Sequence, residues 1–251
     1  MDLFASDLHL SSATPDLNAA FLHLLEGRAR DARRLFLLGD IFEVWVGDED
    51  ADLPEHRPII AALRALSDAG TDIHVLPGNR DFLLGAGFTA ATGATLHGDW
   101  LLCDIAGRQA LLMHGDTLCT DDLPYQQFRR MVRHADWQAA FAARPLAERH
   151  AIAADLRRRS QQAVAGKNEE LMDANSEAIA AVLRHHECTL LIHGHTHRPA
   201  HHALEVDAVA CDRWVIADWR DRACWLEADD HDLRAFTTAG DGRIVPDARF
   251  A

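Results

Sequence analysis

The sequence predicts an α/β fold in which two β-sheets pack as a sandwich flanked by helices, with a helical insertion over one edge. Strand-like apolar runs alternate with helix-like amphipathic runs over residues 1–79, which is the pattern of βαβ units. Alternation of apolar and polar positions returns near the C-terminus, where further short strands are expected. Between these parts, a long stretch rich in Arg, Ala and Gln interrupts the rhythm.

The βαβ part is expected to form one sheet of parallel strands joined by helices. Its first helix should begin at Thr14-Pro15-Asp16, because a proline fits the first turn of a helix. Its second helix should end before Gly70. The expected elements are strands over residues 3–5, 34–38 and 73–76 and helices over residues 15–29 and 59–69.

The rest of the chain is expected to supply a second sheet and the insertion. A hairpin over residues 100–113, a helix over 176–186 and a strand over 189–192 come first, and alternating runs at 209–217, 223–227 and 233–238 should be strands that complete this sheet. Residues 121–175 form the insertion, which we expect to lie over the functional site as a lid and not to form a separate domain. The core is then residues 1–120 and 176–251.

Composition and charge disfavour several classes of protein. The five cysteines are scattered without C-x-x-C spacing, so neither a disulfide framework nor a cysteine zinc site is expected. The N-terminus shows no leader and no run of about 18 apolar residues occurs, so we expect a cytoplasmic chain that is neither exported nor membrane-spanning. A net charge of −14 argues against nucleic-acid binding, although residues 129–167 hold nine basic residues against three acidic ones.

Five short polar segments follow apolar runs and offer only oxygen or imidazole donors. Each is ordinary as a turn when taken singly, but together they match the donor set that two divalent transition metals about 3.5–4 Å apart require. Because ligands gather at the carboxyl ends of strands in an open α/β sheet, we expect the segments to meet. The pattern predicts a two-metal phosphoester hydrolase. The segments are Asp7-Leu8-His9, Gly39-Asp40, Gly78-Asn79-Arg80-Asp81, His114-Gly115-Asp116 and Gly194-His195-Thr196-His197.

This order of motifs resembles the calcineurin-like metallophosphoesterase superfamily, and the resemblance covers nearly the whole chain. Four longer stretches, 6–10, 39–45, 77–83 and 193–199, are similar to one branch of it, the UDP-2,3-diacylglucosamine pyrophosphatases of lipid A biosynthesis. Arg80 follows the asparagine of the third segment, as in that branch, where other superfamily members usually have histidine. The resemblance implies a metallophosphoesterase-type β-sandwich with a helical lid.

The resemblance also implies a set of metal ligands and a reaction. Attack of metal-activated water on the α-phosphorus of UDP-2,3-diacylglucosamine would give UMP and 2,3-diacylglucosamine 1-phosphate. Two Mn²⁺ ions per subunit are expected, although other divalent metals accept the same ligands. The first ion would be held by Asp7, His9, Asp40 and His197, and the second by Asp40, Asn79, His114 and His195. The residues expected to act in catalysis are Asp40, Asn79, Arg80, His114 and His195.

Substrate contacts are expected from the same loops and from the lid. Arg80 would bind phosphate oxygens, because a guanidinium can donate two parallel hydrogen bonds. Ser160 and Lys167 are seven residues apart and would share one helix face with Arg157 and Val164, where the family leads us to expect asparagine in place of Val164. The full set expected to contact substrate is Asn79, Arg80, Asp122, Arg157, Ser160, Val164, Lys167 and His195.

A lipid substrate requires a dry groove and a route to the membrane. Trp137 and Phe141 lie four apart on a helix and could either line the groove or pack the lid on the core. Basic residues of the lid could meet anionic headgroups, so we expect peripheral association with the cytoplasmic face of the inner membrane and no obligate protein partner. The expected groove residues are Trp45, Phe82, Leu83, Phe128, Trp137, Phe141, Ile152 and Leu156.

Two other functions remain open at this point. The same metal chemistry could serve another phosphodiesterase, a nucleotide pyrophosphatase or a nuclease, although the acidic charge disfavours long nucleic acids. The fold could also persist as a metal-binding scaffold without turnover. The first would hydrolyse generic phosphodiesters, and the second would be indifferent to substitution of Asp40.

Overall fold

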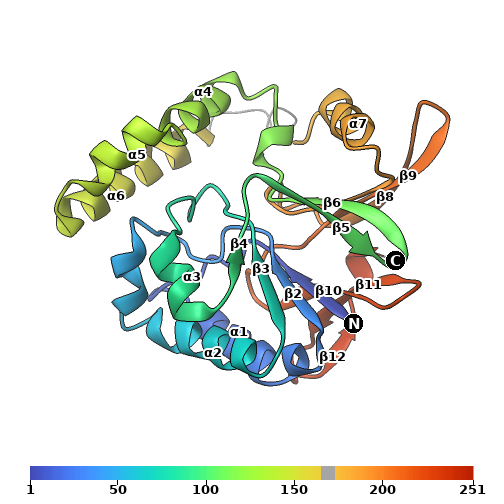
Figure 1. Ribbon diagram of the computed structural model, residues 1–251, viewed down its shortest axis with the longest axis horizontal. Helices are drawn as coiled ribbons and strands as arrows, with labels where there is room; N and C mark the ends of the chain where they lie inside the picture. Colours follow the sequence, from blue (N-terminus) through green and yellow to red (C-terminus); the bar gives the residue numbers. More distant parts are fainter. Residues whose placement is uncertain (165–172, 251) are drawn as a thin grey trace.

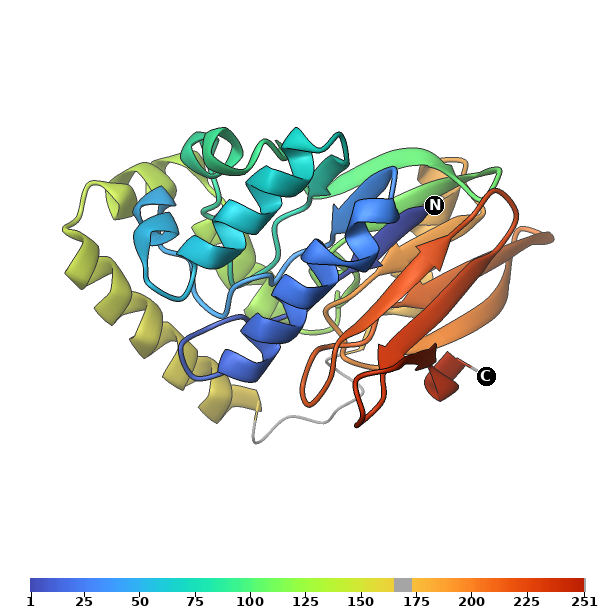
Figure 2. The ribbon, with the colours of Figure 1, turned by 90° about the horizontal axis from the view of Figure 1, so that it is seen from below.

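The computed structural model describes residues 1–164 and 173–250, which form two β-sheets packed face to face between layers of helices (Figures 1 and 2). The first sheet has seven strands in the order β12-β11-β10-β1-β2-β3-β4, and the second has five in the order β5-β6-β7-β9-β8. The predicted α/β sandwich is therefore confirmed. Among the described residues, no helix is both long and apolar enough to pass through a bilayer.

The parallel half of the first sheet arises from the βαβ pattern. Strands β1 (Asp2–Ala5), β2 (Arg34–Leu37), β3 (Asp72–Val75) and β4 (Thr95–Leu96) run parallel. Helix α1 (Pro15–Glu26) ends three residues earlier than predicted, because the chain turns at Gly27 into a 3₁₀ turn over Arg28–Asp31. Helices α2 (Arg57–Asp68) and α3 (Ala86–Thr92) and a second 3₁₀ turn (Asp48–Asp52) follow; α3 and β4 were not predicted.

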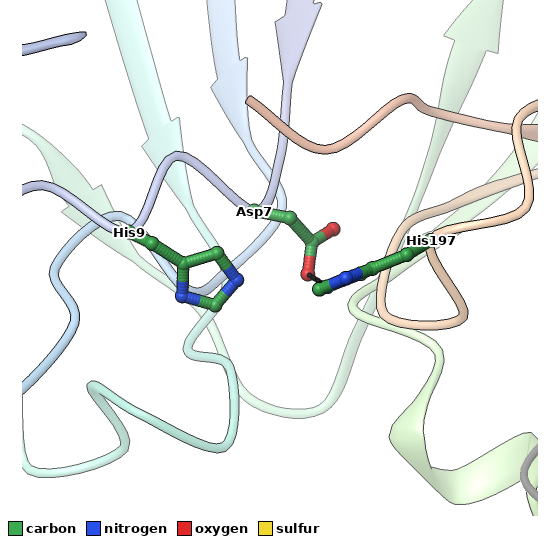
Figure 3. Close-up of side chains that lie close together, drawn as sticks. All are labelled: Asp7, His9 and His197. Atoms are coloured by element: carbon green, nitrogen blue, oxygen red, sulfur yellow. Dashed lines mark hydrogen bonds and ion pairs between the residues drawn. The ribbon is translucent and has the colours of Figure 1, made fainter. Parts of the chain in front are cut away.

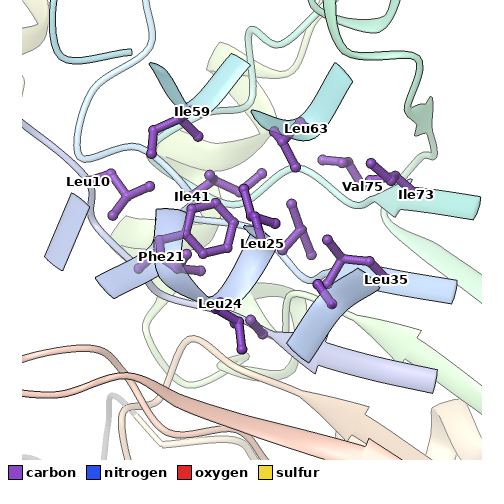
Figure 4. Packing of buried hydrophobic residues seen from close by; sticks show 14 of the residues in the cluster. Leu10, Phe21, Leu24, Leu25, Leu35, Ile41, Ile59, Leu63, Ile73 and Val75 are labelled. Atoms are coloured by element: carbon purple, nitrogen blue, oxygen red, sulfur yellow. The ribbon is translucent and has the colours of Figure 1, made fainter. Parts of the chain in front are cut away.

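The two faces of each strand in this sheet face different layers of the molecule. Leu35 points toward α1 and α2, where it packs with Phe21 and Leu63 (Figure 4), whereas Phe36 points into the space between the sheets. This two-residue alternation explains why the strands are apolar throughout, since both faces are buried. The layer between the sheets is completed from the second sheet by residues such as Leu112 and Ile192.

The second sheet is built from the hairpin β5 (Trp100–Ile105) and β6 (Arg108–Met113) together with β7 (Leu190–His193), β8 (Ala200–Val206) and β9 (Val209–Val215). Helix α7 (Ser176–His185) covers its outer face, where Ile179 and Leu183 pack against Leu111 and Leu191. A 3₁₀ turn (Asp116–Leu118) follows β6. The four layers are thus helix, sheet, sheet and helix.

The prediction that all three C-terminal strands join the second sheet was wrong for two of them. Strands β10 (Cys224–Ala228) and β11 (Leu233–Thr238) belong to the first sheet, where β10 pairs antiparallel with β1, and β12 (Ile244–Pro246) extends it. A 3₁₀ turn (Ala248–Phe250) ends the described chain. Of the three C-terminal strands that were predicted, only β9 joins the second sheet. Alternation along a strand shows which face is buried but not which edge it pairs with, so the sequence did not distinguish the two sheets.

An ion pair between the partly exposed Arg28 and the buried Glu227 fastens the helical layer to β10. Arg28 donates from Nε and Nη2 to the two carboxylate oxygens of Glu227 at 2.7 and 2.6 Å, and Trp225 Nε1 donates to the same carboxylate at 2.9 Å. Burial alone would raise the pKa of Glu227, but these hydrogen bonds outweigh it and lower the pKa. The carboxylate is 3% exposed, so it depends on these donors.

We expect Glu227→Gln to destabilise the fold by about 1–2 kcal/mol. Hydrogen bonds to a charged group contribute about this much when one partner, here Arg28, is partly exposed to solvent. Because the folded pKa of Glu227 is below its unfolded value, the native chain gains this stability above the unfolded pKa and loses it as the pH falls through the folded pKa. Urea unfolding at neutral and acidic pH would test this: the wild type and the variant should differ at pH 7 and converge at low pH. A constant difference would contradict the assignment.

The chain between β6 and α7 forms helices α4 (Leu123–Val132), α5 (Ala135–Ala142) and α6 (Leu146–Val164), which extend beyond the sandwich (Figure 1). Two neighbouring residues hold the first turns of α6 to the core. Arg149 donates to the carbonyl of Val46 at 2.8 Å and pairs with Glu49, and His150 Nε2 lies 2.8 Å from the buried Asp50 carboxylate. The start of α6 is therefore fastened to the 3₁₀ turn that follows β2.

Candidate metal centre and active site

The five polar segments meet at one edge of the sandwich, as expected from their positions at strand ends. Asp7 and His9 follow β1, Asp40 follows β2, and Asn79 follows β3 in the first sheet. His114 follows β6, and His195 and His197 follow β7 in the second sheet. Both sheets thus supply donors to one place.

Asp40 lies in the middle of this cluster. Its carboxylate oxygens lie 3.7 Å from His114 Nε2 and 3.9 Å from His9 Nε2, on two sides of the group. On the His114 side, Asn79 Oδ1 is 3.1 Å and His195 Nδ1 is 3.2 Å from His114 Nε2. On the other side, His197 Nε2 is 3.2 Å from Asp7 Oδ1, and Figure 3 shows His9 and His197 turned toward Asp7. All seven predicted ligands therefore lie in one connected cluster.

The backbone is strained at these positions. Nine residues other than glycine have positive φ angles in the described chain, and five of them are predicted metal ligands: Asp7, His9, Asp40, His195 and His197. A side chain in this conformation costs of order 1–3 kcal/mol, and such strain persists where the surrounding structure enforces it, commonly at functional sites. At these five positions the positive φ angle accompanies a side chain that faces the cluster.

Three imidazoles are each oriented by an oxygen on the side away from the centre. His114 Nδ1 lies 2.8 Å from the carbonyl of Leu38, His9 Nδ1 lies 3.0 Å from Glu43 Oε2, and His197 Nδ1 lies 3.3 Å from Asp218 Oδ2. Such a partner favours a proton on Nδ1 and leaves the lone pair of Nε2 free. His9 Nε2 is buried and makes no hydrogen bond within the described chain. A buried imidazole nitrogen without a hydrogen-bond partner fits the position of a metal ligand.

The electrostatics of the cluster keep its members in different charge states. Burial opposes ionisation of Asp7, but hydrogen bonding and charge from His197 and the nearby His114 hold its pKa below the usual range. Burial also disfavours protonated His9, yet Glu43 and Asp40 outweigh it and raise the pKa of His9 to about 9. Burial and the neighbouring His114 lower the pKa of His195 to about 4. Strong pKa shifts of different sign among neighbouring buried groups are typical of functional sites.

Asp81 joins two of the ligand loops. Its carboxylate accepts hydrogen bonds from the amides of Ile41 and Gly78 at 2.7 Å and from the amide of Asp40 at 3.2 Å. Burial and the nearby Asp40 raise its pKa to about 6. Asp40 in turn accepts a 2.8 Å bond from the amide of Arg80. Asp81 adjoins the ligands in the sequence, where it could be either an orienting group or a turn residue, and in the structure it holds together the loops that carry Asp40 and Asn79.

Helix α4 contacts the other side of the cluster. Asp116 is buried and accepts hydrogen bonds from Tyr125 Oη at 2.8 Å and Arg129 Nε at 2.7 Å. Arg133 Nη2 donates to the carbonyl of Gly78 at 2.9 Å, one residue before Asn79. The first helix of the insertion is therefore part of the wall of the site.

A cavity of about 790 Å³ lies between the cluster and the insertion. Arg80, His195 and His197 line its polar end, and aromatic and aliphatic side chains line the rest. Of the eight residues expected to form a lipid groove, only Ile152 is absent from the described lining. The seven that line the cavity are Trp45, Phe82, Leu83, Phe128, Trp137, Phe141 and Leu156. Trp137 also lies against Phe82 of the core, with ring centroids 6.2 Å apart, so it both lines the cavity and packs α5 on the core.

The other expected substrate contacts have mixed placements. Asn79, Asp122, Arg157 and Ser160 line the cavity. Asp122 also caps α4 by accepting from the amide of Tyr125 at 3.1 Å. Arg157 forms an ion pair with Glu43 at 2.7 Å. Val164 is the last residue of α6, its side chain is not described, and Lys167 lies outside the described residues.

Sequence reasoning did not assign roles to Glu43 and Asp218. Glu43 links His9 to Arg157 on α6, and Asp218 is 7% exposed and faces His197. Asp218 follows the predicted strand 209–217 and so had the same signal as the predicted ligands, a carboxylate at a strand end. The role of Glu43 depends on a contact with a helix about a hundred residues away, which no local pattern shows.

Comparison with known proteins agrees with this geometry. The family model described as calcineurin-like phosphoesterase matches residues 3–199. The chain belongs to the calcineurin-like phosphoesterase family. This confirms the superfamily resemblance drawn from the motifs.

Curated relatives of this calcineurin-like phosphoesterase share one name. A protein of Aromatoleum aromaticum is 48% identical over 90% of this chain and 92% of its own length, and one of Pseudomonas putida is 46% identical over 92% and 95%. A third, from Marinobacter nauticus, is 45% identical over 90% and 92%. All three are named UDP-2,3-diacylglucosamine hydrolase, the branch that the motifs resemble.

Proposed function

We propose that this protein hydrolyses the pyrophosphate of UDP-2,3-diacylglucosamine to UMP and 2,3-diacylglucosamine 1-phosphate, a step of lipid A biosynthesis. The observation that carries the proposal is the joining of a two-sided cluster of metal-ligand side chains to a large, mainly apolar cavity. The proposed substrate matches this arrangement, because its glucosamine carries a charged diphosphate on one side and two apolar acyl chains on the other. The names of the relatives support the same substrate.

The donor set fits two divalent metal ions. One group brings together Asp7, His9 and His197, another brings together Asp7, Asp40 and His114, and Asn79 and His195 stand beside the second. Mixed carboxylate, amide and imidazole donors suit Mn²⁺, which we propose as the ion, with Asp40 between the two positions. When bound, such ions would polarise the phosphoryl group and lower the pKa of a water molecule.

The chain's own side chains would hold the diphosphate and neutralise its charge. Arg80 Nε is buried, lies 3.8 Å from Asp40 Oδ2 and makes no hydrogen bond in the described chain, and the Arg80 side chain lines the cavity. A guanidinium in this state is ready to donate to phosphate oxygens. Asn79 and His195 lie beside it, facing the same space. Water attacks the α-phosphorus, its oxygen stays with UMP, and the sugar 1-phosphate leaves.

Helices α4–α6 act in this proposal as a lid that holds the acyl chains out of water. Each buried CH₂ contributes roughly 0.8 kcal/mol, so the apolar walls supply binding energy away from the reacting atoms. Arg157 and Ser160 on α6 line the cavity, and Arg157 pairs with Glu43 beside His9, so both would contact the sugar phosphate. Binding energy used in this way positions the diphosphate over the metal cluster.

The direct test incubates metal-stripped protein with UDP-2,3-diacylglucosamine, with and without Mn²⁺, and measures UMP. We expect release only with metal, and in H₂¹⁸O the heavy oxygen should appear in UMP. Bis-p-nitrophenyl phosphate and DNA serve as comparison substrates. Hydrolysis of these in preference to the lipid would favour a general phosphodiesterase or nuclease. Label in the sugar phosphate would contradict attack at the α-phosphorus.

Metal binding should also stabilise the fold. At about 100 times the dissociation constant a ligand specific for the native state adds about 2.7 kcal/mol, which for a chain of this size raises the Tm by about 5–10 °C. Differential scanning fluorimetry with Mn²⁺ and with EDTA would measure this shift. His9→Gln should lose most of it, whereas His202→Gln, at an exposed position of β8, should keep it. An equal shift in both variants would contradict the assignment of His9.

The substrate's lipid nature leads us to place the protein on the cytoplasmic face of the inner membrane. Leu123 and Met131 of α4 are 66% and 50% exposed, and Arg158 and Arg159 of α6 also face solvent. Basic residues near an anionic surface contribute about 1 kcal/mol each. Flotation with anionic vesicles should carry the protein at low salt and release it at high salt. No flotation at low salt would contradict membrane docking.

A further inference from the structure

A second cavity, of about 530 Å³, adjoins the metal cluster on the side of His197 away from the insertion. It is bounded by the chain after β9, by Thr237 of β11 and by the residues from β12 to the end of the described chain. His197 and Arg220 line both cavities. The two spaces therefore meet at the metal cluster.

The two cavities differ sharply in chemistry. The first has aromatic and aliphatic walls, whereas the described lining of the second holds three arginines and three aspartates and no aromatic ring except that of His197. Its size lies within the range of small-molecule sites. It also lies away from the insertion, so nothing in it resembles a lipid groove. A polar, charge-balanced space suits a hydrophilic ligand with both donors and acceptors.

We propose that this second cavity binds the uridine nucleotide half of the substrate. The inference rests on the proposed function, because UDP-2,3-diacylglucosamine has two halves of opposite character joined at the diphosphate. When the scissile bond lies at the cluster and the acyl chains occupy the first cavity, the nucleoside must leave in another direction. The second cavity is the polar space that opens there.

Two residues of this cavity are available to a ligand. Arg220 and Arg249 are held by Asp218 and Asp247 at 2.5 and 2.6 Å, but Arg222 has no ion pair within residues 1–164 and 173–250. Asp221 is exposed and likewise has no side-chain bond to a described residue. Uracil offers carbonyl oxygens to a guanidinium, and its N3–H and the ribose hydroxyls can donate to a carboxylate. Arg222 and Asp221 are thus assigned to the nucleoside.

The test compares UMP with ribose 5-phosphate as inhibitors of the manganese-loaded enzyme acting on the lipid substrate. Ribose 5-phosphate retains the sugar phosphate and lacks the base. We expect UMP to bind the wild type at least about tenfold more tightly, the factor expected for one or two hydrogen bonds involving charged groups. Arg222→Ala should remove most of this preference and raise the KM, and Asp221→Asn should reduce it. Both should leave inhibition by 2,3-diacylglucosamine 1-phosphate unchanged.

Two controls separate this site from other causes. Arg243→Ala removes an arginine near β12 that lies outside both cavities and should leave UMP inhibition as in the wild type. Trp137→Ala should weaken inhibition by the lipid product but not by UMP. Unchanged UMP preference in Arg222→Ala and Asp221→Asn, or an equal loss in Arg243→Ala, would overturn the nucleotide site. No UMP release by the wild type would instead overturn the proposed function.

Discussion

Asp40→Asn should lower kcat by at least about a thousandfold, because several kcal/mol of transition-state stabilisation depend on the paired metal centre and each 1.4 kcal/mol changes the rate tenfold. Asp40 is the group that faces both His9 and His114. A carboxylate can donate an oxygen to each of two ions, whereas an amide offers one oxygen and no charge. The variant should therefore bind one metal ion weakly or not at all.

Activity alone would not separate loss of metal from loss of folding, so metal content and stability must be measured together. Isothermal titration with Mn²⁺ should give fewer sites or weaker binding for Asp40→Asn, while urea unfolding of the metal-free variant stays cooperative. Asp52→Asn is a matched control, because Asp52 is largely exposed and its nearest ion pair is 3.8 Å long. Wild-type activity in Asp40→Asn would contradict the role of Asp40 in catalysis and would favour the alternative of a metal-binding scaffold.

The position of the site was predictable because its ligands obey a local rule. Asp7, Asp40 and Asn79 each end an apolar run, and parallel strands bring such ends to one edge. His114 and His195 were predicted in the same way, although they come from the other sheet. The structure brings these side chains within reach of one another.

Features that depend on pairing between distant parts were not predictable. Strands β10 and β11 belong to the first sheet because β10 pairs with the edge of β1 that β2 leaves open. No local property of residues 224–238 indicates this pairing. Glu43 lies three residues after the predicted ligand Asp40, but its own role depends on an ion pair with Arg157 of α6, which forms only in the folded protein. The sequence thus predicted which side chains could act and missed several that hold them in place.

Gly194 leaves no room for a side chain beside the metal ligands. A Cβ at this position would lie 2.1 Å from both Asp7 Oδ2 and Ser6 Oγ, far inside van der Waals contact. Both neighbours are fully buried, and Ser6 Oγ bonds to Asp7 Oδ2 at 2.7 Å, so neither can move aside. Gly194 also carries the backbone that delivers the amide of His195 to Asp7 Oδ2 at 2.9 Å. The side chains of Ser6 and Asp7, packed against the Gly194 backbone, and not conformational freedom, require glycine here.

We therefore expect Gly194→Ala to destabilise the metal-free protein by about 1–3 kcal/mol, as overpacking does, and to lower kcat by at least about a hundredfold through displacement of Asp7 and His195. Urea unfolding and manganese titration would measure the two effects separately. Gly98→Ala is the matched control, since a Cβ there meets no atom within 4 Å and should change stability by less than about 0.5 kcal/mol. Wild-type metal affinity in Gly194→Ala would mean that Asp7 can shift without loss of the site, and Asp7 would then no longer be a required ligand.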